Sequence, residues 1–293
     1  MAIVYTLVNQ KGGVGKTTSA INLGAYLGYY GQKVLLIDLD PQANATSCLG
    51  INKHDVKAGT YEVLLGTKGI AEPILHNPRF KMSLLPSSPA LAGAEVELVD
   101  MEERHNRMRK GIQPVMDRYD YILIDCPPSL SLLTLNGLVA AINGVLIPVQ
   151  CEYLALEGIG QLVQTLGKVR SSLFADLEIR GVMMTMEDKR TRLSHDVITE
   201  VQKFFPNQVF HAAVPRNIRV AEAPSFGQPI LFYDENSSGA IGYQLLALEL
   251  LYGDNKLDKT QLVQQLDGMK EQGRIADENY KSFLKALGKN IIH

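Results

Sequence analysis

Short runs of consecutive apolar residues alternate along this chain with longer stretches of helical periodicity. Because apolar runs of about four to eight residues are typical of strands buried on both faces, we predict strands at residues 3–8, 33–38, 82–86, 121–125, 145–149 and 179–186. The periodic stretches predict helices at residues 17–30, 90–119, 132–141, 156–172 and 195–205. This alternation is typical of an α/β fold with a doubly wound, mostly parallel sheet that is covered by helices on both faces.

The α/β pattern continues without a linker to about residue 252. We therefore expect residues 1–252 to form one domain and residues 253–293 to form a helical C-terminal extension. Two apolar stripes in the extension are separated by Gly273 and consist of Leu262, Leu266 and Met269, then Phe283, Leu284, Leu287 and Ile291. We expect these helices to pack on the body or on another protomer. A basic amphipathic membrane anchor, with Lys281, Lys285 and Lys289 on its polar side, is the alternative.

Composition and charge limit the classes of protein that fit. The hydrophobic content of 46% and the charged content of 20% are ordinary for a globular protein. No apolar run approaches a membrane span and the first strand begins at Ile3, so we expect a cytoplasmic protein without a signal peptide. With 31 acidic and 29 basic residues the net charge is −2, so binding to nucleic acid would need a local basic patch. The spacing of Cys48, Cys126 and Cys151 indicates neither a disulfide framework nor a zinc site.

A glycine-rich segment lies between the first predicted strand and the first predicted helix. It reads Gln10-Lys11-Gly12-Gly13-Val14-Gly15-Lys16-Thr17-Thr18. Because glycines let the backbone curl around an anion, successive N–H groups and the helix N-terminus would point at nucleotide phosphates. Lys16 would reach the β- and γ-phosphates, and the Thr17 hydroxyl would bind Mg²⁺. The segment predicts an ATP-binding P-loop, although Gln10 stands where the pattern G-x-x-x-x-G-K-[ST] has its first glycine.

Two further predicted strands end in acidic residues. The second strand ends in Asp38-Leu39-Asp40-Pro41, and the strand at residues 121–125 ends in Asp125. Because ligands bind at the carboxyl ends of parallel strands, we expect these carboxylates to lie beside the P-loop. An aspartate at the end of an apolar strand is typical of a Walker B motif, which holds Mg²⁺ through a coordinated water.

The additional lysine, Lys11, makes the P-loop resemble the deviant Walker A motif, K-G-G-x-G-K-[ST], of the ParA/MinD ATPases. Other segments resemble the ParA/Soj DNA-partition ATPases in the same order along the chain, namely residues 38–46, 91–95, 125–129, 148–153, 155–158, 215–217 and 222–225. The resemblance covers nearly all of the first 252 residues. It implies an ATPase that uses ATP and Mg²⁺ and forms a homodimer with ATP.

The resemblance also implies a role for each matching residue. Lys16 would bind the phosphates of its own nucleotide, whereas Lys11 would reach the partner's nucleotide across the dimer interface. Asp40 would position the attacking water, and Asp125 would hold the water shell of the metal with Asp38 nearby. The nucleotide-binding set would also include Gly12, Gly13, Val14, Gly15, Thr17, Thr18, Glu152, Pro215, Arg216 and Asn217. This set would be sufficient for slow hydrolysis, because phosphoryl transfer needs positioning and charge neutralisation. Hydrolysis would be coupled to dimerisation, because Lys11 would act on the partner's nucleotide.

A basic segment suggests where DNA would bind. Residues 165–220 carry nine lysines and arginines against six acids, and the densest part is Lys189-Arg190-Thr191-Arg192 in a predicted loop. In the resemblance, Arg190 and Arg219 match arginines that contact DNA without regard to sequence. We therefore expect Lys189, Arg190, Arg192 and Arg219 to contact the phosphates of non-specific double-stranded DNA. The resemblance further implies a nucleoid-associated protein with a ParB/Spo0J-type partner that stimulates hydrolysis.

Other functions compatible with a P-loop remain open from the sequence. A MinD-like ATPase that cycles on and off a membrane is the first alternative. A small-molecule ligase such as dethiobiotin synthetase is the second, and Lys11 argues against it. A role like that of the nitrogenase iron protein is disfavoured because no cysteine pair is placed to bridge a cluster.

Overall fold

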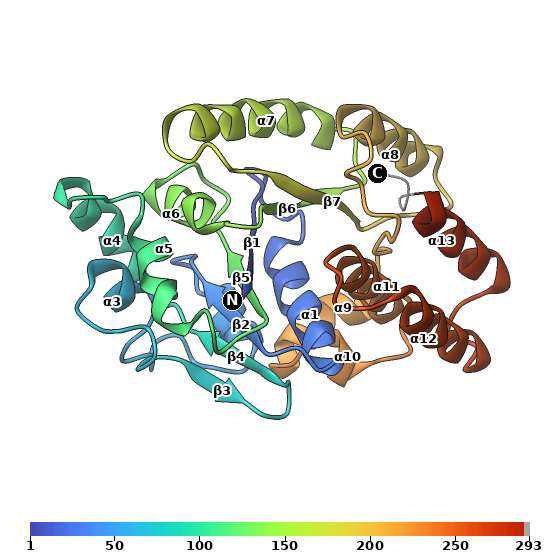
Figure 1. Ribbon diagram of the computed structural model, residues 1–293, viewed down its shortest axis with the longest axis horizontal. Coiled ribbons are helices and arrows are strands. Elements are labelled where there is room, and N and C mark those ends of the chain that lie inside the picture. The colour runs from blue at the N-terminus through green and yellow to red at the C-terminus, as the bar shows by residue number, and fades with distance from the viewer. Residues whose placement is uncertain (290–293) are drawn as a thin grey trace.

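Seven strands form one sheet in the computed structural model, which describes residues 1–289 (Figure 1). The strand order is β3-β4-β2-β5-β1-β6-β7, and every neighbouring pair is parallel except β3 and β4. The strands are β1 (Ile3–Leu7), β2 (Val34–Asp38), β3 (Leu75–Asn77), β4 (Met82–Leu85), β5 (Tyr121–Asp125), β6 (Val145–Gln150) and β7 (Ile179–Thr185). The predicted mostly parallel sheet is confirmed.

One face of the sheet is covered by helices from the two ends of the chain. These helices are α1 (Lys16–Tyr29) and α11 (Ser238–Gly253), and α10 (Ile230–Tyr233), α12 (Lys259–Glu271) and α13 (Asp277–Lys289) pack against them or against each other. Helix α1 lies very close to the sheet, because a Cβ atom on Gly28 would come within 2.6 Å of the carbonyl oxygen of Lys81. A larger residue at position 28 would push α1 away from the start of β4.

The opposite face is covered by the middle of the chain. Over β2, β4 and β5 lie α3 (Thr60–Leu65), α4 (Leu91–Glu97), α5 (Arg107–Ile112) and α6 (Leu132–Ala140). Over β6 and β7 lie α7 (Ala155–Ser172) and α8 (Arg192–Phe204). Helices therefore cover both faces, which confirms the doubly wound arrangement.

The short helices α3 and α10 were not predicted, and two further features of the helices differ from the prediction. The stretch at residues 90–119 is not one helix but α4, α5 and two short 3₁₀ turns, η1 (Leu98–Asp100) and η2 (Gln113–Val115). Glu103 has a φ of 50°, which a right-handed helix cannot contain, and Pro114 lacks the N–H that a continuing helix needs. Helix α11 was not predicted, because it is apolar on nearly all sides and therefore has no polar face to give it a period.

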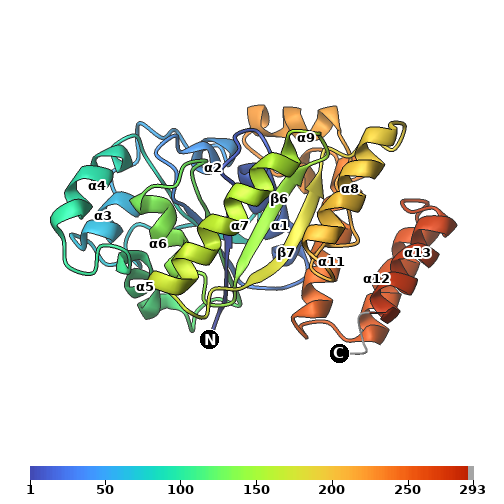
Figure 2. The ribbon, with the colours of Figure 1, turned by 90° about the horizontal axis from the view of Figure 1, so that it is seen from above.

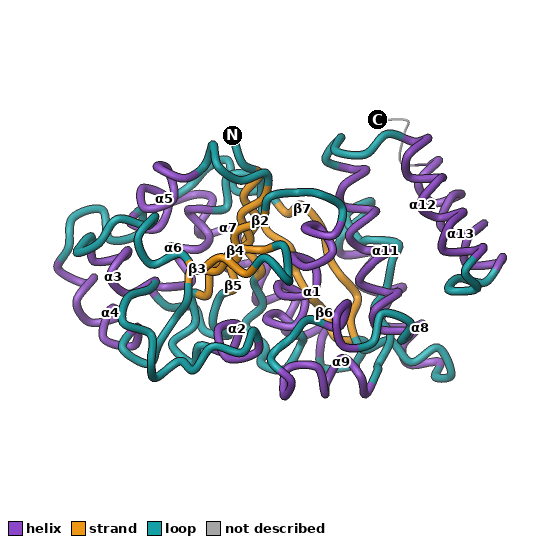
Figure 3. The backbone as a smooth tube through the Cα atoms, turned by 90° about the horizontal axis from the view of Figure 1, so that it is seen from below, coloured by secondary structure: helices purple, strands orange, loops and turns teal. Residues whose placement is uncertain are grey.

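Helices α12 and α13 lie side by side at the end of the molecule, next to α11 (Figure 3). Leu262, Leu266 and Met269 of α12 are buried in the same hydrophobic cluster as α1 and α11, and so are Phe283 and Leu287 of α13. Both predicted apolar stripes are thus packed on the body, while Ile291 lies outside the described residues. Within residues 1–289, no helix is both long and apolar enough to cross a membrane.

A polar cluster connects the amino ends of three strands to the end of α11. The Asp254 carboxylate accepts hydrogen bonds from the hydroxyls of Tyr5 (2.7 Å) and Tyr121 (2.9 Å) and pairs with the Arg180 guanidinium at 2.9 Å. Burial and the nearby Asp254 charge raise the pKa of both tyrosines, so they remain donors. The cluster fixes the point from which the C-terminal helices leave the sheet.

Candidate functional site

The candidate site lies at the carboxyl edge of the sheet, where the P-loop connects β1 to α1. Two short helices, α2 (Asn44–Cys48) and α9 (Ile218–Glu222), lie along this edge, opposite the N-terminus (Figure 2). Asp38 and Asp125 are the last residues of β2 and β5, which run beside one another in the sheet. The topology therefore brings the predicted acids and the P-loop together, as expected for parallel strands.

The P-loop is an open, concave turn of the backbone. Gly13 and Gly15 have φ angles of 74° and 87°, which side chains other than glycine rarely tolerate. A Cβ atom built on Gly12 or Gly13 would meet nothing within 4 Å. Helix α1 begins at Lys16, directly after the loop, so the N–H groups of its first turn are available to an anion.

Lys16 places a largely buried ammonium group at the mouth of this turn. Its Nζ donates a hydrogen bond to the Lys11 carbonyl oxygen at 3.2 Å. Burial lowers the pKa of Lys16, and the negative charges of Asp125 and Asp40 oppose that shift. A phosphate bound in the turn would supply the strong anionic partner that the amine lacks in the described residues.

Side chains that the sequence analysis did not select hold the P-loop in place. The Thr185 hydroxyl, at the end of β7, donates to the Val14 carbonyl oxygen at 2.9 Å. Asn9 accepts a hydrogen bond from the Lys11 N–H at 3.0 Å and donates to the Pro148 carbonyl oxygen at 2.8 Å. Each is a polar residue at or just after the end of an apolar strand, and that position could have identified both.

Asp125 is a buried carboxylate without a partner of its own. Its side chain is 0% exposed, and neither of its oxygens accepts a hydrogen bond of normal geometry within the described residues, although Thr17 lies nearby. Burial, together with the charge of Asp38, raises the pKa of Asp125 to about 8. An unpartnered carboxylate beside a threonine hydroxyl and a phosphate cradle fits the water shell of a bound Mg²⁺. Residues 1–289 hold no cluster of three or more His, Cys, Asp or Glu side chains placed to bind a metal by themselves.

Asp38 is already bonded within the protein. One of its oxygens accepts from both the N–H (2.8 Å) and the hydroxyl (2.7 Å) of Thr46, and the other accepts from the Asp40 N–H at 3.3 Å. Burial raises the pKa of Asp38 to about 6, against the effect of these hydrogen bonds. Asp38 therefore fixes α2 and the turn after β2, and its predicted contribution to a metal site stays a prediction.

Asp40 lies in the turn between β2 and α2 and is also buried. One side-chain oxygen accepts from the Gln42 N–H at 2.8 Å, while its main-chain carbonyl accepts from the Ser87 hydroxyl at 2.8 Å. The other carboxylate oxygen makes no hydrogen bond within the described residues. It is the atom of Asp40 that could orient a water molecule.

Lys11 reaches toward Glu152 at the surface beside the P-loop. The side chain of Lys11 is 29% exposed, and its Nζ lies 3.9 Å from Glu152 Oε2. The other oxygen of Glu152 lies 3.2 Å from the Arg216 guanidinium and accepts from the Gln150 amide at 2.7 Å. Next to this group, Tyr153 and Leu154 are 72% and 62% exposed. The surface beside the P-loop thus combines two cations, one carboxylate and two large apolar side chains.

The segment at residues 215–217 borders the site next to Glu152, which Arg216 contacts. Asn217 caps α9, since its side-chain oxygen accepts from the Val220 N–H at 3.2 Å, and its amide donates to the Ser238 hydroxyl at 2.9 Å. Pro215 packs against α11, where a Cβ on Gly242 would lie 3.0 Å from its ring. The predicted adenine contacts of Pro215, Arg216 and Asn217 stay predictions.

The predicted DNA-contacting residues lie in two adjacent segments. Lys189 and Arg190 are in the loop after β7, Arg192 begins α8, and Arg219 is in α9. A parallel bridge between Glu187 and Pro215 joins the starts of the two segments. Two of the three arginines are paired with acids, Arg190 with Asp188 at 2.8 Å and Arg219 with Glu222 at 3.0 Å. Arg190 is nevertheless 88% exposed.

Comparisons with known proteins agree with this arrangement. A family profile described as an AAA domain matches residues 2–179. The sporulation initiation inhibitor protein Soj of Bacillus subtilis (strain 168) is 49% identical over 250 residues, which are 85% of this chain and 98% of Soj. The chromosome partitioning protein ParA of Myxococcus xanthus is 48% identical over 252 residues, which are 86% of this chain and 88% of that ParA.

A solved structure has the same fold. The cobyrinic acid a,c-diamide synthase from Mycobacterium smegmatis with bound ADP and magnesium matches with a TM-score of 0.76 and 37% sequence identity. The match covers 86% of this chain and 94% of that protein. The fold is therefore shared with a protein crystallised with bound ADP and magnesium.

Proposed function

Because this chain belongs to the ParA/Soj family of partition ATPases, we propose that it is an ATP-dependent DNA-partition switch. ATP brings two copies together, the homodimer binds double-stranded DNA without regard to sequence, and a ParB-type partner stimulates hydrolysis and release. The observation that carries the proposal is the position of Lys11. The Lys11 ammonium lies on the surface beside the P-loop, 3.9 Å from Glu152, and its side chain is 29% exposed, so a second molecule that displaces Glu152 would reach it.

ATP and Mg²⁺ fit the residues of the P-loop edge. The backbone from Gly12 to Gly15 and the Lys16 ammonium would hold the phosphates, with Thr17 and Thr18 at the start of α1. Asp125 and the Thr17 hydroxyl would hold the Mg²⁺ and its waters, and the ion would neutralise charge on the phosphates. The unpartnered, buried carboxylate of Asp125 supports this assignment.

Hydrolysis requires a positioned water and an additional cation. Asp40 has one carboxylate oxygen free to orient the water. Lys11 from the other copy would act like an arginine finger, an effect worth roughly 10³ to 10⁵ in rate in other nucleotide hydrolases. Turnover would then depend on dimerisation, which suits a switch better than a metabolic enzyme.

DNA would bind through Lys189, Arg190, Arg192 and Arg219. These residues are on two segments that begin at the same bridge, so both segments can present cations on one face. Two copies would double the number of phosphate contacts, so affinity would rise on dimerisation and fall steeply with salt. Because Arg190 and Arg219 are paired with Asp188 and Glu222, DNA phosphates must replace these carboxylates.

Size-exclusion chromatography with light scattering tests the proposal directly. The protein is run with ADP, with ATP and with a non-hydrolysable ATP analogue, each with and without a DNA fragment of arbitrary sequence. We expect a monomer with ADP, a dimer with the analogue, and a complex with DNA only under dimer conditions. A monomer under every nucleotide condition, or DNA binding that does not depend on nucleotide, would overturn it.

A small-molecule synthase is the second candidate, because the M. smegmatis structure carries that title. A synthase would hydrolyse ATP only with its small substrate, whereas the partition switch should hydrolyse ATP alone, faster with DNA and at higher protein concentration. A phosphate-release assay without added small substrate separates the two. A MinD-like membrane cycle would need an exposed C-terminal helix, and the burial of Phe283 and Leu287 in α13 disfavours it.

A further inference from the structure

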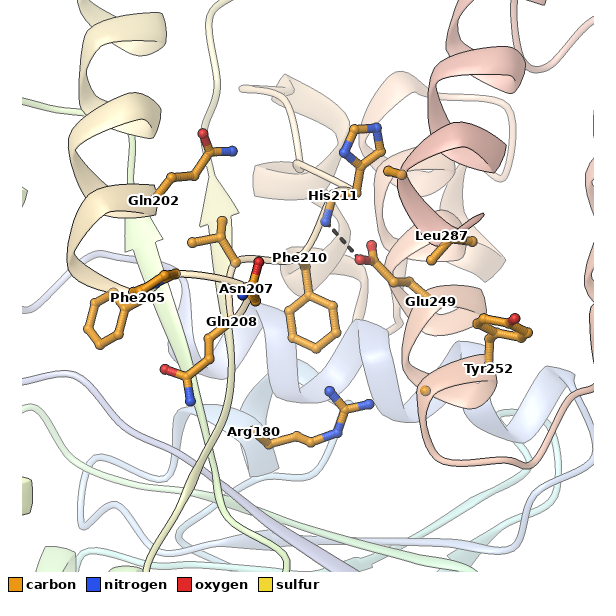
Figure 4. Close-up of a pocket in the computed structure, with 14 residues that line it drawn as sticks. Arg180, Gln202, Phe205, Asn207, Gln208, Phe210, His211, Glu249, Tyr252 and Leu287 are labelled. Carbon is orange, nitrogen blue, oxygen red and sulfur yellow. Dashed lines mark hydrogen bonds between the residues drawn. The ribbon is translucent and has the colours of Figure 1, made fainter. Parts of the chain in front are cut away.

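A cavity lies at the amino end of β7, far from the P-loop at the carboxyl edge of the sheet. Its volume is about 870 Å³, within the range of ligand-binding sites. Helix α8, the segment at residues 206–211, the end of α11 and helix α13 surround it (Figure 4). The proposed partition mechanism uses none of these residues.

The segment at residues 208–210 forms an open edge of the sheet in this cavity. The Val182 N–H donates to the Gln208 carbonyl at 2.8 Å, and the Phe210 N–H donates to the Val182 carbonyl at 2.9 Å. In such a parallel ladder the N–H and C=O of the intervening residue, Val209, point away from β7. Val209 lines the cavity, and neither of its main-chain groups makes a hydrogen bond within residues 1–289.

The open edge ends at Glu249 of α11. The Glu249 carboxylate accepts from the main-chain N–H groups of His211 (2.8 Å) and Ala212 (2.9 Å), and the first of these bonds is drawn in Figure 4. Each of its oxygens keeps capacity for a further donor. The Glu249 carboxylate oxygens are therefore buried hydrogen-bond acceptors at this end of the cavity.

Arg180 lies at the other end of the edge. Because Val182 pairs with Val209, Arg180 is level with the turn at Asn207. Its Nε and Nη2 bond to Asp254 and Tyr5, but Nη1 makes no hydrogen bond within the described residues. Figure 4 shows the guanidinium pointing into the cavity below Phe210. Three side chains, Phe205, Phe210 and Leu287, give the cavity apolar walls.

We propose that this cavity binds the carboxyl-terminal end of an extended apolar peptide, which adds to the sheet as a short antiparallel strand beside Val209. One peptide residue exchanges two hydrogen bonds with the N–H and C=O of Val209. In the antiparallel direction the peptide carboxylate reaches Arg180. There it accepts hydrogen bonds from the guanidinium N–H groups that have no partner in the described residues. The amino side of the peptide then approaches Glu249, where N–H or ammonium donors are favoured. The direction of the peptide thus follows from the hydrogen-bonding groups at the two ends, which are the unbonded Nη1 donor of Arg180 and the acceptor oxygens of Glu249.

Fluorescence polarisation with a synthetic probe tests the proposal on the full-length protein. The probe is a fluorescein-labelled glycine–lysine–valine–threonine–valine–leucine peptide with a free carboxylate, whose β-branched residues favour an extended chain. We expect saturable binding, and about tenfold or greater weakening when the carboxylate is replaced by an amide. Equal affinity of the acid and the amide would overturn the proposal.

A matched pair of variants tests the backbone contact. Val209→Pro removes the outward N–H without removing a ladder bond to β7, whereas Val209→Ala keeps it. We expect Val209→Pro to bind the probe at least about tenfold more weakly than Val209→Ala at equal thermal stability. Two further peptides, each with an N-methyl group on one of the two valines, give the same test on the ligand side, because the methyl group removes one backbone N–H. This test remains valid if Val209→Pro does not fold. Unchanged affinity for every N-methylated peptide, or amide NMR shifts on probe binding that avoid residues 207–212, would contradict the assignment.

Discussion

Asp38 and Asp125 lie directly opposite each other, at the last position that β2 and β5 share in the sheet. Both carboxyl groups are fully buried. Burial is the main reason that their pKa values rise to about 6 and about 8, and the charge of Asp38 adds to the shift of Asp125. In the nucleotide-free protein, burial therefore favours the protonated form of Asp125.

This pair makes the stability of the nucleotide-free protein depend on pH. Both folded-state pKa values exceed the ordinary value of 3.8, so the folded chain binds more protons than the unfolded chain between about pH 4 and pH 8. The free energy of unfolding should fall as pH rises through that window. Asp125→Asn should flatten the curve and raise the Tm at pH 8 by about 2–6 °C, with little change at pH 4. Scanning calorimetry at several pH values measures this, with the exposed Asp117→Asn as control. A Tm difference that is the same at every pH would contradict the assigned cause.

Lys11→Ala should separate nucleotide binding from dimerisation. The Lys11 ammonium pairs with Glu152, and the phosphate cradle is proposed to consist of the glycines and Lys16, so the affinity of the monomer for ATP should change by less than about threefold. The ATP dimer should be lost, and turnover should fall by roughly 10³ if the trans contact resembles an arginine finger. Lys16→Ala is the matched variant and should abolish nucleotide binding itself. The measurements are titration calorimetry and light scattering, and a Lys11→Ala protein that dimerises normally would refute the trans role.

Asp40→Ala should trap the ATP-bound dimer. The substitution removes the carboxylate oxygen proposed to orient water and leaves the glycines and Lys16 unchanged. We expect ATP to keep the protein dimeric for hours and phosphate release to fall at least about a hundredfold. Asp40→Asn, which keeps the bond from the Gln42 N–H, checks that the turn is intact. Wild-type phosphate release by Asp40→Ala would remove Asp40 from the mechanism.

Arg190→Glu and Arg219→Glu should weaken DNA binding while dimerisation survives. Each reverses a charge on the proposed face, so affinity should fall about tenfold for any DNA sequence, with a shallower dependence on salt. Arg118→Glu makes the same change in net charge near the amino end of β5 and is the control. Electrophoretic mobility shifts or fluorescence anisotropy at about 100 mM salt measure the effect. If all three variants bind DNA equally, the binding face is elsewhere.

Removal of residues 258–293 should destabilise the body. Leu262, Leu266, Met269, Phe283 and Leu287 share a hydrophobic cluster with α1 and α11, so truncation exposes the side of α11 that they cover. We expect the Tm to fall by about 5 °C or more, or the truncated protein to self-associate. Leu266→Ala, a milder change, should cost about 2–5 kcal/mol. Binding of the full-length protein to anionic vesicles, with no change in Tm on truncation, would instead indicate a membrane anchor.

The sequence was sufficient for the parts of this fold that have strong local patterns. Buried strands, the glycine-rich turn and the acids at strand ends could each be recognised from short segments, because their physics is local. Helix α11 could not, since a helix buried on nearly all sides has no polar stripe. The role of Thr185 could not be predicted from its own segment, because it depends on the strand order that brings the end of β7 to the P-loop. The pairing of Lys11 with Glu152 also joins residues that are distant in the chain.

The exposed Tyr153 and Leu154 beside Lys11 and Glu152 bear on how such a switch could be reversible. If the dimer forms on this surface, the same atoms must face water in one half of the cycle and a second molecule in the other. A larger apolar area would hold the copies together after the nucleotide had gone, and would cause aggregation in the free protein. A surface of charged residues alone would bind the second copy weakly, because salt at physiological concentration screens exposed charges. Two apolar side chains among cations and a carboxylate lie between these limits. The nucleotide, rather than this surface, can then set the lifetime of the dimer.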